Sequence, residues 1–219
     1  MSSYSNFIQD FPSRCLDILK KYEKHAITHN REVTLMLAIA TAGFVIPFER
    51  LRPPYSEDSD HPSRDREKFS KARNELERIL DVSFVDSTLW NKKDVGSWIF
   101  AKELRDVERE PDFWPELKSP KSLSIKKQVS SILKHLRNGL ANGNIYTKGN
   151  PIRLIIFLQR PHKSTDKYDM LAASPEDFRE FLTNWFKFLG DLPIPSGIMQ
   201  ESVLELPEYL VQNSSLHML

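Results

Sequence analysis

The sequence predicts a mainly α protein, a helical bundle with a short β-hairpin inserted between its most basic helix and its last long helix. Three observations support this fold class. Apolar side chains recur at helical spacing along most of the chain, one β-branched run interrupts them late in the sequence, and a strong helix start follows that run. The chain has 219 residues and 40% hydrophobic residues, enough for one compact core. We therefore expect a single domain over residues 1–219.

The first third of the chain predicts three helices and a loop. Near-helical apolar spacing predicts a long helix from about Phe7 to His29. The segment Glu32–Phe48 is apolar around nearly its whole circumference, so we expect other elements or a partner subunit to enclose it, with Pro47 limiting its extent. Residues 52–66 concentrate Pro, Ser and charge, and we expect a mobile loop there. A helical pattern resumes over Glu67–Leu80.

The middle of the chain contains the most informative helix. The stretch Asp81–Pro120 predicts no definite element, although Trp90, Trp98 and Trp114 are expected to anchor it to the core. The next helix is predicted by an apolar stripe at helical period, made of Ile125, Val129, Ile132, Leu133, Leu136 and Leu140. Gly143 can take the left-handed conformation that ends helices.

A hairpin and a final helix are expected next. Ile152–Gln159 is a β-branched run after turn residues, and Lys167–Ala173 can return as its antiparallel partner. Ser174, Pro175 and Asp177 then read as an N-cap, a first-turn proline and a capping acid. They lead into an aromatic helix that Gly190 ends. For the C-terminal tail, residues 200–219, the sequence pattern predicts no definite element.

Composition excludes several classes of function. Cys15 is the only cysteine, so no internal disulfide or cysteine-based metal site is possible, and a reducing compartment fits best. His25 and His29 have the spacing of a metal pair but no evident third ligand. The apolar run Thr34–Ile46 is too short to span a bilayer, and the N-terminus lacks secretory-signal features. We expect a cytoplasmic protein without metal, other cofactor or membrane contact.

Charge is unevenly distributed although the net charge is only +1. No Asp or Glu occurs between Leu117 and Thr165. The basic residues of that stretch are Lys118, Lys121, Lys126, Lys127, Lys134, Arg137, Lys148, Arg153, Arg160 and Lys163. A local positive field of this kind suits a phosphate backbone. The alternative is a solvated basic face that binds nothing in particular.

The end of the basic helix, LKHLRNGLANGNI at residues 133–145, resembles a known family. HEPN domains carry an Arg, often followed by Asn, with a His four to six residues further on near the end of a long helix. Arg137 and Asn138 match this motif, and Asn142 stands where the His is expected. The order of buried helix, motif helix, hairpin and aromatic helix also resembles the HEPN subgroup named after pEK499. The resemblance covers about Phe7 to Leu189.

The resemblance implies metal-independent RNA cleavage, in which the ribose 2′-hydroxyl attacks the adjacent phosphodiester. Two protomers pool their motifs, so it also implies a homodimer, with an antitoxin or another defence-system protein as a possible further partner. The catalytic positions would be Arg137, Asn138 and Asn142. The expected RNA contacts are Lys126, Lys127, Lys134, His135, Arg137 and Lys148.

Asn142 bears on whether this chain is an active enzyme. An amide has no titratable proton near neutral pH, and losing a general acid or base costs roughly 10²- to 10⁴-fold in rate. Asn142 could be the natural residue of a non-catalytic member, or an engineered replacement of His. A third alternative is an ordinary helix-end residue beside Gly143. His135 could substitute as proton carrier, but we expect a surface or interface histidine.

The sequence is therefore consistent with two functions. The first is an RNA-binding HEPN-type protein from a lineage of toxin or anti-phage endoribonucleases, with catalysis impaired by Asn142. The second is a non-catalytic helical dimerisation or interaction protein, in which the Arg-Asn motif is structural.

Overall fold

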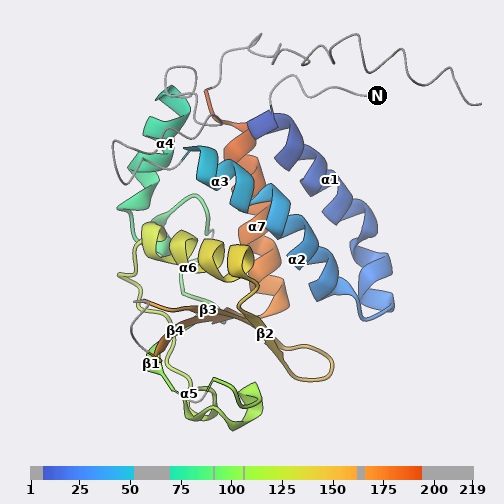
Figure 1. Ribbon diagram of the computed structural model, residues 1–219. Coiled ribbons are helices and arrows are strands. Elements are labelled where there is room, and N and C mark those ends of the chain that lie inside the picture. The colour runs from blue at the N-terminus through green and yellow to red at the C-terminus, as the bar shows by residue number, and fades with distance from the viewer. Residues whose placement is uncertain (1–6, 52–69, 91, 106, 162–165, 194–219) are drawn as a thin grey trace, which may run out of the picture.

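The computed structural model places a group of helices over one face of a small antiparallel sheet (Figure 1). It describes residues 7–51, 70–90, 92–105, 107–161 and 166–193. The loop expected over 52–66 and the tail expected over 200–219 lie outside these residues. The mainly α fold class is confirmed.

The helical layer agrees with the sequence-based expectations. It consists of α1 (Phe7–Thr28), α2 (Glu32–Gly43), α3 (Val45–Leu51), α4 (Ser70–Leu80) and α7 (Pro175–Gly190). α1 packs along both α2 and α7, so the first and last long helices lie side by side (Figure 1). The motif-bearing helix α6 (Val129–Asn142) lies between this layer and the sheet.

The sheet has four antiparallel strands in the order β1-β4-β3-β2. They are β1 (Ile99–Leu104), β2 (Ile145–Lys148), β3 (Leu154–Gln159) and β4 (Tyr168–Ala173). The hairpin expected from the β-branched run is confirmed as β3 and β4. The sequence did not predict the two edge strands, β1 and β2. β1 comes from the stretch that predicted no element, and β2 follows α6 directly.

Both faces of the sheet are covered. On one face, Ile155 and Phe157 of β3 belong to the main core beneath the helices. On the other, Ile156 and Leu158 pack with Trp114, which lies between the short helices η2 (Pro111–Phe113) and α5 (Pro115–Lys118). This double burial explains why the β3 run lacks the apolar-polar alternation of a half-exposed strand. The expected burial of Trp90, Trp98 and Trp114 is confirmed.

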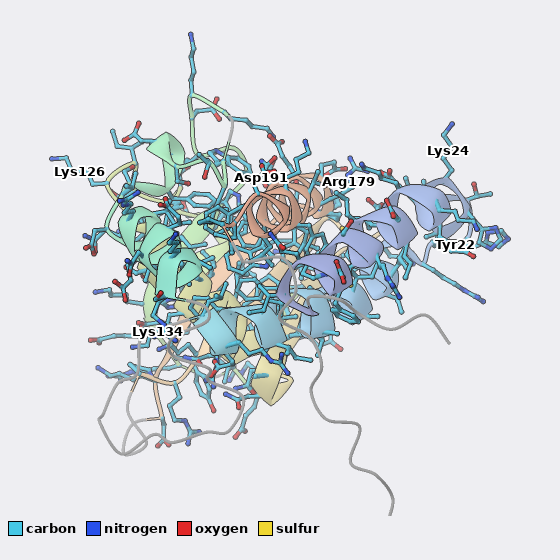
Figure 2. All side chains as sticks on the ribbon, turned by 90° about the horizontal axis from the view of Figure 1, so that it is seen from above. Tyr22, Lys24, Lys126, Lys134, Arg179 and Asp191 are labelled. Carbon is cyan, nitrogen blue, oxygen red and sulfur yellow. The ribbon has the colours of Figure 1, made fainter. Side chains whose placement is uncertain are left out.

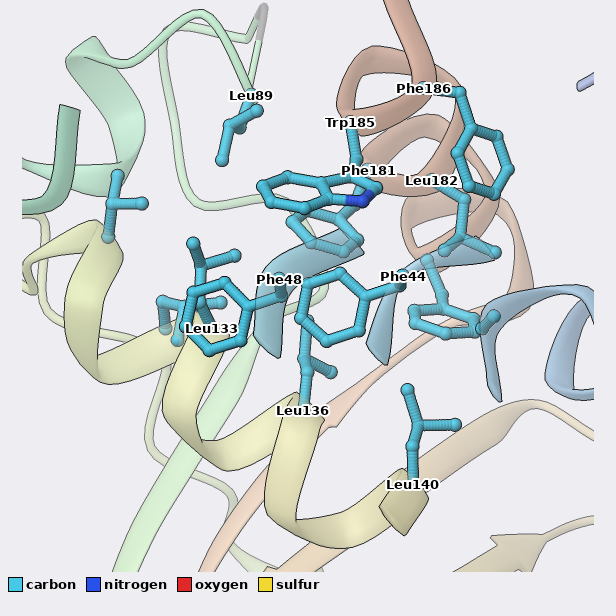
Figure 3. Packing of buried hydrophobic residues seen from close by; sticks show 14 of the residues in the cluster. Phe44, Phe48, Leu89, Leu133, Leu136, Leu140, Phe181, Leu182, Trp185 and Phe186 are labelled. Carbon is cyan, nitrogen blue, oxygen red and sulfur yellow. The ribbon is translucent and has the colours of Figure 1, made fainter. Parts of the chain in front are cut away.

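The inward side of α6 fixes this helix in the core. Leu136 and Leu140 point toward the rings of Phe44, Phe48 and Trp185 (Figure 3). The Phe44 and Trp185 rings meet edge to face, with centroids 5.1 Å apart. Apolar burial therefore joins α2, α3, α6 and α7, and it determines which side of α6 can face solvent.

Pro47 does not end the second helix as expected. Helix α2 ends at Gly43, and α3 begins at Val45 after a break at Phe44. Pro47 thereby falls in the first turn of α3, where its missing N–H leaves no helical hydrogen bond unmade. The helical run continues to Leu51. By length and composition alone, Glu32–Leu51 could cross a membrane, with a mean hydropathy of 1.5, but a core helix of a folded domain has the same character.

Two local predictions were wrong. Ile125 is not part of the apolar stripe, since α6 begins only at Val129 and Ile125 is 61% exposed in the turn before it. Asp177 does not act through its carboxylate as a helix cap, although Ser174 does accept from its backbone N–H at 3.2 Å. The Asp177 carboxylate instead accepts from the backbone and hydroxyl of Ser97 and pairs with Lys92. It ties the loop before β1 to α7.

Gly139 marks the closest approach of α6 to the sheet. A Cβ atom at this position would lie 2.9 Å from the Cβ of Phe157 in β3. We predict that Gly139→Ala lowers the free energy of unfolding by about 1–3 kcal/mol, because overpacking outweighs alanine's better helix propensity. Gly190→Ala is the matched control, since nothing lies within 4 Å of its added Cβ. Urea denaturation measures both, and a Gly139→Ala protein as stable as wild type would contradict the packing.

Candidate functional site

The three motif positions lie on the outward side of the last two turns of α6. Asn142 is exposed, while Arg137 and Asn138 are half-buried. Asn138 and Asn142 are four positions apart and therefore share one side of the helix, and Arg137 lies next to Asn138, about 100° around the helix axis. The opposite side carries the buried Leu136 and Leu140. The expectation that the motif ends the helix is met by Gly143, which has a φ of 68° and caps α6.

The Arg137 guanidinium makes two hydrogen bonds within the protein. Its Nε–H donates to Oε1 of Glu49 at 2.5 Å, and its Nη1 donates to Oδ1 of Asn138 at 2.8 Å. The side chains of Arg137 and Glu49 are 29% and 27% exposed, so the ion pair is partly shielded from water. Glu49 belongs to α3, and the contact therefore links α3 to α6.

Sequence reasoning missed Glu49. It lies 88 positions before Arg137, and no local pattern connects the two residues. The available signal was weak: Glu49 is the first acidic residue after an apolar run that other elements or a partner subunit were expected to enclose. Only the packing of α3 against α6 brings its carboxylate to the motif.

The expected RNA contacts do not form one cluster. Lys126 and Lys127 precede α6, whereas Asn142 ends it, and a helix of this length separates them by roughly 20 Å. Lys134 is exposed between the two ends, and Figure 2 shows Lys126 and Lys134 pointing away from the body of the molecule. Lys127 is more enclosed, with Nζ 3.6 Å from the centroid of the Phe100 ring.

Acidic residues from other segments approach the acid-free stretch. Lys148, at the end of β2, lies 3.7 Å from the Asp112 carboxylate, and Glu49 pairs with Arg137. The local positive field expected from the sequence is thus partly neutralised in three dimensions. The exposed Lys126, just before α6, and Lys134, within α6, remain the clearest cationic positions of this region.

His135 is in the core, and the expectation of a surface or interface histidine was wrong. It is 6% exposed, and its ring meets Phe100 edge to face at 5.2 Å. Its Nδ1 hydrogen-bonds the Ser131 carbonyl at 2.7 Å, so Nδ1 carries the hydrogen. Within the described residues its Nε2 is buried without a partner. The protein thus encloses the His135 ring, which differs from the surface position at which an RNA contact was expected.

A cavity of about 600 Å³ lies between α4 and α7, away from these motif positions. Ile79, Lys187 and Phe188 are among its lining residues, and none of the expected catalytic or RNA-binding residues lines it. Cys15 is buried elsewhere, and burial raises the pKa of its thiol to about 11, which leaves it unreactive at neutral pH. Neither feature competes with the motif as a catalytic site.

The burial of His135 predicts a pH-dependent stability. Burial lowers its pKa below the ordinary value, and the hydrogen bond to Ser131 only partly opposes this effect. As the pH falls below about 6.5, the unfolded chain therefore binds a proton that the folded chain excludes, and stability decreases. We expect His135→Gln to flatten the fall in unfolding free energy between about pH 7 and 5. Equal slopes for wild type and His135→Gln would contradict this assignment.

Comparison with known proteins identifies the family. The model of the family described as HEPN pEK499 p136 matches residues 1–194. No curated protein and no solved structure matches the chain. The match covers the motif helix, the sheet and the aromatic helix α7, and it confirms the resemblance found in the sequence. The chain belongs to the HEPN pEK499 p136 family.

Proposed function

We propose that this chain is a cytoplasmic RNA-binding protein of HEPN type, derived from metal-independent endoribonucleases of toxin or anti-phage defence systems. One observation carries the proposal: Arg137, Asn138 and Asn142 share the outward side of α6 in a chain that belongs to a HEPN family. Asn142 at the usual histidine position impairs catalysis. RNA is then bound at the motif but cleaved slowly or not at all.

Arg137 supplies the phosphate contact in this proposal. A guanidinium holds a phosphate through paired hydrogen bonds and offsets the charge that develops during cleavage. The exposed Lys126, just before α6, and Lys134, within α6, would contact the phosphate backbone on the N-terminal side of the motif. The lineage reaction is the attack of a ribose 2′-hydroxyl on the adjacent phosphorus. The hydroxyl loses a proton, and the departing 5′-oxygen gains one. Asn142 can orient these groups but cannot transfer either proton.

A homodimer is part of the proposal, because the lineage reaction uses motifs from two copies. The outward side of α2 and α3 supports association. Ala38, Thr41 and Ile46 are exposed there, and Leu37 and Val45 are half-buried. The side chains of this surface are therefore apolar or small. Pairing copies through such a surface removes apolar area from water and places α6 near the shared interface.

The second candidate function is a non-catalytic helical interaction protein. The ion pair between Glu49 and Arg137 favours it, because this contact already gives the motif arginine a role in joining α3 to α6. If Arg137 has only this structural role, the protein does not need to bind RNA through it. The two functions therefore predict different results for an Arg137 substitution: it lowers RNA affinity in the first function and does not in the second.

We predict salt-dependent RNA binding that Arg137→Ala weakens by roughly tenfold or more, because a hydrogen bond to a charged group contributes about 1.5–3 kcal/mol. Lys24→Ala is the matched control: it removes the same charge from an exposed position on α1, at the opposite side of the molecule from Lys126 and Lys134 (Figure 2). Filter binding at several salt concentrations measures both. Equal effects of the two substitutions would favour the structural function.

Restoring the histidine is the test of the catalytic lineage. Asn142→His places an imidazole five positions from Arg137, where the negative end of the α6 dipole favours its charged form. We expect RNA cleavage to appear or to rise by roughly 10²-fold or more. The products should carry 2′,3′-cyclic phosphates, and EDTA should not change the rate.

The double variant Asn142→His, Arg137→Ala is the control for contaminating nucleases, and its activity should return to the background level. Asn142→Gln tests whether any change at the helix end alters RNA cleavage. If Asn142→His protein folds, binds diverse RNA and cleaves none of it, the catalytic lineage is wrong for this chain.

A further inference from the structure

The hydrogen bonds of Arg137 leave part of its guanidinium available. An arginine side chain has five N–H donors, and two of them are used, by Glu49 on Nε and by Asn138 on Nη1. Within the described residues, Nη2 has no hydrogen-bond partner in the protein. Nη1 and Nη2 together therefore still have three N–H donors for an anion.

Glu49 contacts the guanidinium in a way that orients it. A carboxylate competing fully with phosphate would bind an edge through two parallel hydrogen bonds. Here the Glu49 carboxylate accepts from Nε, next to the side-chain stem, through Oε1. Asn138 accepts from Nη1. Two acceptors on different nitrogens fix both the plane and the rotation of the group.

We infer that Glu49 is a positioning residue for RNA binding: its carboxylate, with the amide of Asn138, holds the Arg137 guanidinium so that the Nη edge faces a phosphate. This inference rests on the proposed RNA-binding function. The position of Glu49 suits this role, because Glu49 belongs to the short helix α3. Phe48 and Leu51 of the same helix are buried in the core. The acceptor is thus supplied from a fixed element.

The sign of the effect separates positioning from simple electrostatics. Removing a negative charge near bound RNA strengthens binding if Glu49 only repels or competes with phosphate. If Glu49 orients Arg137, Glu49→Ala weakens binding despite the lost repulsion, by roughly threefold to tenfold. Glu49→Gln keeps an oxygen acceptor for Nε without the charge, and it should retain affinity within about twofold.

Two controls complete the RNA-binding experiment. Glu75→Ala removes the same charge from α4, where Glu75 pairs with the exposed Arg78, and it should not weaken binding. In an Arg137→Ala background, Glu49→Ala should have no further effect, because the group that it orients is absent. Thermal unfolding identifies any variant that binds poorly because it is unfolded.

A second measurement does not depend on RNA. In ¹⁵N-labelled protein, the Nε–H signal of Arg137 is assigned by its loss in Arg137→Ala. Its exchange with water should be slow in wild type and Glu49→Gln and faster in Glu49→Ala, since the hydrogen bond protects it. Equal exchange rates in all three proteins would overturn the orienting contact.

The outcomes distinguish this inference from the proposed function. If wild type binds no RNA, the proposed function fails and the positioning role fails with it. If wild type binds RNA and Arg137→Ala weakens binding, but Glu49→Ala strengthens it or leaves it unchanged, only the positioning role is overturned. Tightening in both Glu49→Ala and Glu49→Gln would identify Glu49 as a competitor of phosphate.

Discussion

The close packing of α6 between the helical layer and the sheet is the constraint on which the rest of the structure depends. Gly139 lets α6 approach Phe157 of β3, while Leu136 and Leu140 fill the space beneath Phe44, Phe48 and Trp185. With both of these sides occupied, only one strip of α6 can face outward. The motif lies on that strip, since Arg137 and Asn138 are half-buried and Asn142 is exposed.

The same constraint divides the polar residues of α6 into two groups with opposite roles. His135 is two positions from Arg137, yet it points into the core and keeps a neutral imidazole there. Arg137 points outward and pairs with Glu49. A sequence reader sees two neighbouring cations beside a candidate catalytic position. The helix places His135 in the core and Arg137 at the surface.

The periodicity of apolar residues and the positions of helix-capping and turn residues predicted most of the fold. α1, α7 and the hairpin of β3 and β4 follow from local patterns, because helix caps, apolar stripes and β-branched runs act over short distances. The edge strand β1 was not predictable, since its burial comes from pairing with β4, about seventy positions later in the chain. Glu49 was missed for the same reason. The motif itself was found, but the acid that contacts it comes from a distant segment.

RNA crosslinking tests the central claim, that the outward side of the last turns of α6 meets RNA. The protein would be irradiated with RNA containing 4-thiouridine, digested with trypsin and analysed by mass spectrometry. Cleavage after Arg137 and Lys148 yields one peptide, residues 138–148, that contains both Asn138 and Asn142. The account predicts crosslinks concentrated in this peptide. Crosslinks confined to α1, or to the segment before Val129, would contradict it.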